Sequence, residues 1–339
     1  MHRVPVPVLV LLVVLATVGP TAAYEPRASL VVWGPAAAMA DPTSGAAETD
    51  RLLRVCRDLD IARVHWMVDP ERQRPDGVRR FLRRTAEAGV DVYALTPGTL
   101  QQHWIAPFRK DGRADHAVVT RWIDAVLDLE DLDSGARFAG VLLDVEPYSA
   151  RAPGAWRRTW KNSGDGLRHP RNEAIARAYL ELLDVVGTRL GDSPSRPVVG
   201  VAIPTWWDRA DPGADFRIEV AGDHRTLAAH VQERVDFVAV MAYRAGADEA
   251  GRQRIVDDVA PTIARGPTEV LLETARPGGD GPARRETVHR GGVRRLRVIR
   301  DLLHGHFGAT EGFRGVGYHA YLDAVGAGTR RWPESLPED

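Results

Sequence analysis

The chain has 339 residues, of which 44% are hydrophobic and 27% charged, and its formal net charge is −1. This balance provides no overall field for nucleic acid or an anionic lipid surface, so we expect neither as a partner. Cys56 is the only cysteine, which excludes an intramolecular disulfide and leaves the hydrophobic core to hold the fold together. The basic residues are nearly all arginine, which we interpret as a codon-usage effect.

The first 23 residues have the three-part form of a secretory signal. The basic start Met1–Arg3 is followed by an apolar run from Val8 to Val18 and by the small residues Thr21–Ala23. The apolar run is too short to span a membrane, and no cysteine is near enough for a lipid anchor. We therefore predict cleavage after Ala23 and a secreted, extracellular monomer without a membrane anchor, in which residues 24–339 form one domain.

Short apolar runs alternate with longer segments of helical period along the rest of the chain. The expected strands are Leu30–Trp33, Ala62–Val68, Val92–Leu95, Val141–Asp144, Val198–Ile203, Phe237–Met241, Val270–Leu272 and Gly315–Tyr318. The expected helices are Thr49–Leu59, Pro75–Ala88, Ala117–Leu129, Glu173–Leu190, His224–Gln232, Gln253–Ile263 and Gly292–His304. This alternation is typical of a parallel α/β fold, and eight strands predict a single (β/α)8 TIM barrel.

The fourth expected strand carries the main catalytic candidates. In the run Gly140–Tyr148, Asp144 and Glu146 are two residues apart, so both point to the same side of an extended chain. Acids at the carboxyl end of a barrel strand lie at the mouth of the active site. Glu146 suits the role of proton donor in glycoside cleavage, because an ionised Asp144 and an apolar barrel wall would both raise its pKa.

The ends of the other strands carry aromatic and polar residues suited to carbohydrate. Aromatic rings pack against the apolar faces of sugars, while Asp, Arg and His hydrogen-bond the hydroxyl groups. The expected substrate contacts are Trp33, His65, Trp66, Trp206, Trp207, Asp208, Arg244, Tyr318, His319 and Tyr321. Because Trp206 and Trp207 are adjacent, they face opposite ways in an extended segment and one of them is expected in the core. We predict a polysaccharide or oligosaccharide as the partner, and no cofactor or metal, since no nucleotide-binding or Cys-pair zinc motif is present.

These motifs resemble glycoside hydrolase family 18, the chitinase-like barrels. Ala139–Glu146 is similar to that family's fourth-strand Asp-x-Asp-x-Glu motif, Met241–Tyr243 to its sixth-strand Met-x-Tyr motif, and Gly315–Asp323 to its eighth strand. The resemblance implies that Glu146 is the general acid, that Asp144 steadies the substrate's N-acetyl group and that Tyr243 hydrogen-bonds the same group. The phrase Leu-Asp-Val-Glu-Pro-Tyr also resembles secreted bacterial barrel proteins without an established activity.

The chain departs from the family pattern at four positions. Ala139 and Leu142 replace its two upstream acids, Arg244 replaces its sixth-strand Asp, and His319 replaces its eighth-strand Trp. Two missing acids leave open a catalytically silent barrel that only binds glycans.

Two other kinds of chemistry also stay open. Glu273 ends the seventh strand, where many retaining glycosidases of clan A, which the chain resembles in that placement only, carry their nucleophile. That clan usually has Asn before the acid, and Val145 is there instead, so we prefer the Asp144/Glu146 pair. A metal-dependent polysaccharide deacetylase could use His65, Asp144, Glu146 and His319, although no ligand spacing such as His-x-His supports it.

Overall fold

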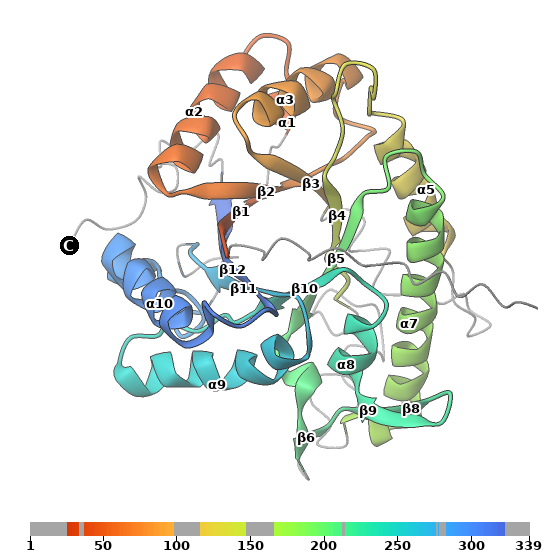
Figure 1. Cartoon of the computed structure of the whole chain (residues 1–339), viewed down its shortest axis with the longest axis vertical. Helices are drawn as coiled ribbons and strands as arrows, with labels where there is room; N and C mark the ends of the chain where they lie inside the picture. The colour runs from red at the N-terminus through yellow and green to blue at the C-terminus, as the bar shows by residue number, and fades with distance from the viewer. Residues whose placement is uncertain are drawn as a thin grey trace, which may run out of the picture.

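The computed structural model describes residues 26–33, 37–97, 116–146, 166–211, 214–275, 277 and 283–322. Eight parallel strands close into a barrel in the order β1-β12-β11-β10-β5-β4-β3-β2, and helices surround it (Figure 1). This confirms the predicted (β/α)8 TIM barrel. The predicted signal segment lies outside the described residues. None of the helices within those ranges is long and apolar enough to cross a membrane.

Each barrel strand overlaps one of the expected strands. The strands are β1 (Ala28–Trp33), β2 (Ile61–Met67), β3 (Asp91–Leu95), β4 (Gly140–Leu143), β5 (Val198–Pro204), β10 (Phe237–Met241), β11 (Thr268–Glu273) and β12 (Phe313–Leu322). Barrel strands are buried on both faces, toward the lumen and toward the helices, which is why they are continuous apolar runs in the sequence.

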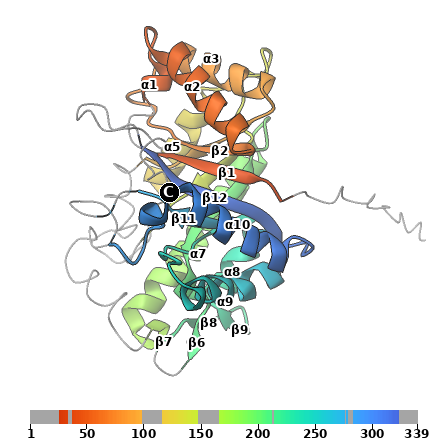
Figure 2. The same ribbon diagram turned by 90° about the vertical axis from the view of Figure 1, so that its left-hand side faces the viewer.

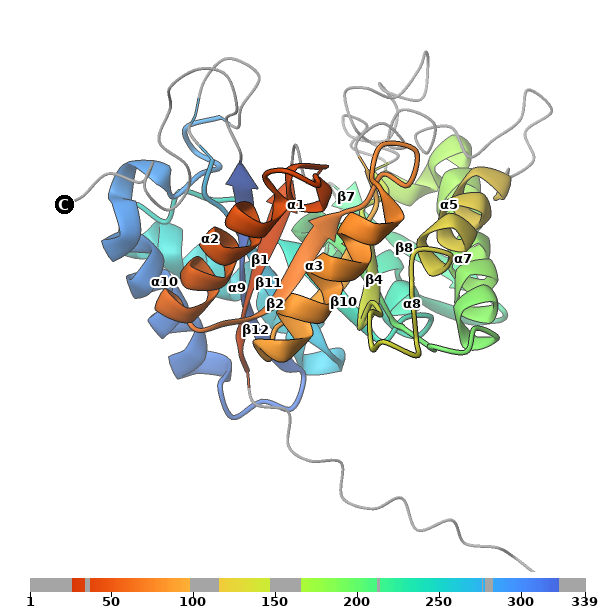
Figure 3. The same ribbon diagram turned by 90° about the horizontal axis from the view of Figure 1, so that it is seen from above.

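The helices pack around the barrel, as the side views show (Figures 2 and 3). They are α1 (Ala37–Ala40), α2 (Gly45–Asp58), α3 (Pro75–Glu87), α5 (Ala117–Leu127), α7 (Pro170–Gly191), α8 (Leu227–Gln232), α9 (Glu249–Arg265) and α10 (Gly292–Phe307), with the 3-10 turns η1 (Gly166–Arg168), η2 (Thr205–Asp208) and η3 (His289–Gly291). Helix α3 begins with Pro75, whose fixed φ suits the first turn. The Asp248 side chain caps α9 by accepting from the Gly251 N–H at 2.7 Å.

The expected helix His224–Gln232 is wrong in its first part. Residues 223–226 form strand β9, which pairs with β8 (Arg217–Val220) in an antiparallel hairpin. Ala221 and Gly222 both have positive φ, as a two-residue hairpin turn requires. The Thr226 side chain accepts a hydrogen bond from Ala229 N, so α8 begins only at Leu227. Two further strands of two residues each, β6 (Ala210–Asp211) and β7 (Ala214–Asp215), also pair in an antiparallel manner.

Two glycines make room for aromatic rings in the barrel lumen. A Cβ atom at Gly140 would lie 2.2 Å from the Tyr93 ring, and one at Gly200 would lie 2.1 Å from the Phe237 ring. The two rings meet edge to face with their centroids 5.7 Å apart. The lumen is therefore a packed core and not a pore.

The lumen also encloses a buried polar cluster centred on Glu269. Arg63 Nη1 lies 2.5 Å from Glu269 Oε2, His65 Nε2 lies 2.9 Å from Oε1, and the Ser29 hydroxyl donates to Oε1. All four side chains are at most 4% exposed. This corrects the prediction that His65 contacts substrate, because its ring points into the closed lumen. Trp66, the next residue, points outward and packs against Phe81 of α3, with the ring centroids 4.3 Å apart, and it is fully buried. Trp66 therefore belongs to the core, which corrects its prediction as a substrate contact as well.

Candidate active site

Five predicted site residues meet at the carboxyl ends of four barrel strands. Asp144 and Glu146 follow β4, Tyr243 follows β10, Glu273 ends β11 and His319 lies in β12. The charges of all three carboxylates act on the Tyr243 hydroxyl and on the His319 imidazole. The Tyr243 and His319 rings are stacked, with centroids 5.5 Å apart and planes at 28°.

A small cavity lies beside three of these five side chains. Asp144, Tyr243 and His319 line it together with apolar lumen residues, namely Val31, Leu95, Leu142, Ala202, Met241 and Leu271. Its volume of about 20 Å³ holds about one water molecule.

Hydrogen bonds fix the Glu273 carboxylate at this rim. Glu273 Oε2 lies 2.8 Å from His319 Nδ1, and Oε1 accepts from Ala275 N at 2.7 Å. The neighbouring Thr274 ties β11 to β12, because its backbone N–H and its hydroxyl both donate to the His319 carbonyl, the hydroxyl at 2.8 Å. The Glu273 carboxylate therefore has one orientation, fixed through both of its oxygens.

The electrostatics of the rim favour a charged His319 and a neutral Tyr243. Burial alone would lower the pKa of His319, but the charge and hydrogen bond of Glu273, with Asp144 and Glu146, raise it above the ordinary value of 6.5. Burial, and then the charges of Glu273, Asp144 and Glu146, hold the pKa of Tyr243 well above 10. Tyr243 therefore keeps its proton and can donate a hydrogen bond to a ligand.

Two residues beside Asp144 were not predicted as part of the site. The Asp144 N–H donates to the Thr96 hydroxyl at 3.0 Å, which fixes the backbone where β4 ends. The Tyr179 hydroxyl on α7 is buried and makes no hydrogen bond within the described ranges, and its pKa is raised by burial and by the Asp144 charge. Tyr179 lies among helical core residues, so the sequence contains no signal for this placement.

Three other expected substrate contacts have structural roles. Trp207 is fully buried, with its ring 5.1 Å from that of Tyr179, and Tyr318 is 1% exposed. The burial of Trp207 confirms that one of the two adjacent tryptophans lies in the core. Asp208 is bound to Thr226, Thr262 and Arg265. The prediction that these residues contact substrate is therefore corrected: Trp207 and Tyr318 are buried, and the Asp208 carboxylate is already bound.

The remaining expected contacts lie in different surroundings. Arg244 forms an ion pair with Asp258 of α9 at 2.5 Å, so its charge is directed away from the rim. Trp206 is partly buried against Phe216, with centroids 4.8 Å apart. The side chains of Trp33 and Tyr321 lie outside the described part of the structure.

The metal-hydrolase alternative required four side chains to meet. His65 is bound to Glu269 inside the lumen, whereas Asp144, Glu146 and His319 are at the rim. In the ranges that the structure describes, no three His, Cys, Asp or Glu side chains are grouped as metal ligands.

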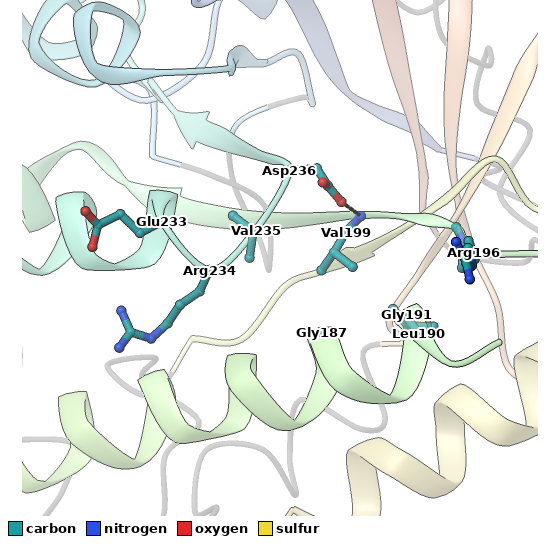
Figure 4. Close-up of a pocket in the computed structure, with 10 residues that line it drawn as sticks. Gly187, Leu190, Gly191, Arg196, Val199, Glu233, Arg234, Val235 and Asp236 are labelled. Carbon is teal, nitrogen blue, oxygen red and sulfur yellow. Dashed lines mark hydrogen bonds between the residues drawn. The ribbon is translucent and has the colours of Figure 1, made fainter. Parts of the chain in front are cut away.

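A larger hollow of about 390 Å³ lies at the opposite end of the barrel (Figure 4). It is lined by Gly187 and Gly191 of α7, by Val199 near the start of β5, and by Arg234 and Asp236 just before β10. Asp236 Oδ2 accepts from Val199 N at 2.7 Å, so this carboxylate joins the starts of two strands. Among the described residues that line the hollow none is aromatic, so they offer no ring surface on which a sugar could stack.

No protein-family model matches the chain, and no curated protein is significantly similar to it. Among similar solved structures is a fungal β-1,4-galactanase, with a TM-score of 0.50 and 13% identity over 87% of this chain and 89% of that one. The β-galactosidase from the psychrophilic Marinomonas ef1 gives 0.51 and 12% over 87% of this chain and 54% of that one. The Bacteroides uniformis β-glucuronidase gives 0.51 and 11% over 89% and 31%.

These similarities concern the fold. This chain spans about half of the length of the β-galactosidase and about a third of that of the glucuronidase. The barrel is thus of the kind found in glycoside hydrolases, and these neighbours do not single out the chitinase-like family.

Proposed function

We propose that the protein is a secreted glycoside hydrolase that cleaves an extracellular polysaccharide, with Glu146 as the general acid. The observation that carries the proposal is the group of three carboxylates, Asp144, Glu146 and Glu273, around the stacked His319 and Tyr243 rings. Glycoside cleavage needs one carboxyl group to protonate the leaving oxygen and a second group to attack or stabilise the positive anomeric carbon. The rim of this barrel offers both.

The second group in this proposal is Glu273, a revision of the preference that the sequence resemblance gave to Asp144. The Glu273 carboxylate is held in one orientation through both oxygens, by the Ala275 N–H and by His319, as a nucleophile needs. Glu146 would protonate the glycosidic oxygen as Glu273 attacks the anomeric carbon, and would then take a proton from the water that releases the sugar. Asp144, two residues before Glu146 at the same strand end, assists at the reacting centre, and Tyr243 donates to a substrate oxygen.

Product release from polysaccharides with and without N-acetyl groups tests the proposal. We expect the mature protein to cleave a glycan without N-acetyl groups, and Glu146→Gln and Glu273→Gln each to lose at least about a hundredfold in rate. Thermal unfolding should be unchanged in Glu146→Gln, whereas Glu273→Gln should stay folded but lose the stability that its pair with His319 contributes. Glu181→Gln, an exposed glutamate of α7, is the matched control and should keep full activity.

Three other results would contradict parts of this assignment. Cleavage restricted to N-acetylated glycans, lost in Asp144→Asn but kept in Glu273→Gln, would restore the substrate-assisted Asp144/Glu146 mechanism. Full activity of Glu146→Gln would exclude it as the acid. Glycan binding without any cleavage would make the protein a silent glycan-binding barrel.

A further inference from the structure

Residues 284–300 differ in charge from the rest of the chain. These 17 residues contain seven arginines and a single acid, Glu286, whereas the whole chain has a formal net charge of −1. A local block of like charge is the usual mark of a surface that binds the opposite charge. The net charge of −1 does not reveal this positive block, because acidic residues elsewhere in the chain offset it.

Four of these arginines form an exposed surface, and none of them makes an ion pair with another residue of the described ranges. Arg284, Arg290, Arg294 and Arg297 are exposed and are together called the arginine surface here. The ion pairs found in this segment involve other arginines: Arg285 with Glu286, and Arg300 with Asp301. Arg294 and Arg297 are three residues apart in α10, so they lie on one side of that helix, and Arg290 precedes them in η3.

The arginine surface begins at the edge of the candidate active site. Val288 N donates to the Glu273 carbonyl at 2.9 Å, and the Thr287 hydroxyl donates to the Ala275 carbonyl at 2.7 Å. Ala245 N, two residues after Tyr243, donates to the Arg285 carbonyl at 2.8 Å. The segment from 283 to 291 is thus bound to the ends of β10 and β11, and α10 then continues along the outside of the barrel (Figure 3).

We infer that the arginine surface binds carboxylate groups of an acidic polysaccharide that extends from the active site. The inference rests on the proposed function and specifies its substrate class. Guanidinium groups bind carboxylates through paired hydrogen bonds, whereas the three carboxylates of the rim repel acidic groups at the cleaved bond itself. Arginines that follow one another from the rim through η3 onto α10 match a linear chain better than the plane of a membrane.

Binding of polygalacturonate is the direct test, measured by calorimetry at low salt in Glu146→Gln so that the probe is not cut. Removal of three exposed ion pairs in Arg290→Gln/Arg294→Gln/Arg297→Gln should weaken binding about tenfold. The matched control is Arg54→Gln/Arg57→Gln/Arg254→Gln, three exposed arginines of α2 and α9, which changes the net charge equally and should leave the affinity unchanged. Added salt should weaken binding of the control more than that of the triple variant.

Other probes decide whether the partner is a glycan. We expect neutral β-1,4-galactan, vesicles of anionic phospholipid and duplex DNA to bind more weakly than polygalacturonate. An equal loss in both triple variants, or tighter binding of the vesicles or the DNA, would overturn the inference. The two tests are independent: polygalacturonate binding through these arginines does not require cleavage, and failure of the proposed function would show only in the product-release assay.

Discussion

His319 is the residue whose role is most open to a pH measurement. Its pKa is raised in the folded protein above the ordinary value of 6.5 by the charge of Glu273, against the effect of burial. A raised pKa means that the charged pair stabilises the fold fully below pH 6.5, and that this stabilisation is lost as the pH rises through the folded-state value. We expect His319→Gln to lower the free energy of unfolding at pH 6 by about 2 kcal/mol, as a charge-assisted hydrogen bond does, and by less at pH 9.

Urea unfolding of wild type and variant from pH 5 to 9 measures this difference. The control is His224→Gln, because His224 is exposed on the β8–β9 hairpin, and its effect should be small at every pH. A difference for His319→Gln that grows with pH would contradict the assigned charge.

Asp208 separates two interpretations of one side chain. The sequence suggested a substrate contact, whereas the structure shows a carboxylate that is 6% exposed and bound to Thr226, Thr262 and Arg265. Asp208→Ala should therefore destabilise the protein by about 3 kcal/mol, because a partly buried cation and two hydroxyls lose their partner. Chemical unfolding should show the loss, while KM for any substrate found stays unchanged. An altered KM at normal stability would restore the earlier interpretation.

The sequence predicts the acids of the rim better than the aromatic contacts, for a physical reason. Asp144, Glu146 and Glu273 end or closely follow apolar runs. A carboxylate at that point is expected at the end of the buried strand, because a charge inside the strand would be costly to bury. His65 and Trp66 also lie near a strand end, but one ring faces the lumen and the other faces α3. Alternation shows that the two differ in face, and it does not show which face is covered.

At the scale of elements, the strand glycines Gly140 and Gly200 leave room for the aromatic rings that fill the lumen. Gly200→Ala in β5 would place a methyl group 2.1 Å from the Phe237 ring, so we expect a destabilisation of about 1–3 kcal/mol from overpacking. Gly305→Ala in α10 is the matched substitution, since nothing lies within 4 Å of the new methyl group, and it should stabilise by about 0.5–1 kcal/mol. The melting temperatures should move in opposite directions. A shift of the same sign in both variants would show that the Phe237 ring can move away.

The elements that the sequence missed depend on contacts distant in the chain. The segment 223–226 has no strand pattern of its own, and it becomes β9 because β8 lies opposite across a two-residue turn. By contrast, the barrel strands were predicted well because each is buried on both faces, so that nearly every residue of the strand is apolar. The strand order follows from the right-handed βαβ connection, which a repeated strand–helix alternation imposes.

At the scale of the whole molecule, the Glu269 cluster links β11 to β1 and β2 inside the barrel. Ser29 lies in β1, Arg63 and His65 in β2, and Glu269 in β11. Burial alone would raise the pKa of Glu269, but His65, Arg63 and Ser29 hold it well below its ordinary value of 4.5. A lowered pKa means that the cluster stabilises the fold above pH 4.5 and loses this effect as the pH falls. Acid unfolding of the barrel should therefore depend strongly on this one carboxyl group.

Glu269→Gln tests this dependence. At pH 7 it should cost about 3–5 kcal/mol, because it leaves the buried Arg63 charge uncompensated. The difference from wild type should shrink below pH 4.5, because the unfolded wild type then takes up a proton that the native carboxylate does not. The control is Asp215→Asn, since the pKa of Asp215 is lowered to about 2, chiefly by Arg217 in a more exposed pair, and its loss should cost less than about 1 kcal/mol. Unfolding free energies from pH 3 to 7 compare the two. Equal, small effects would mean that the barrel is held by its apolar layers and that the buried ions contribute no net stability.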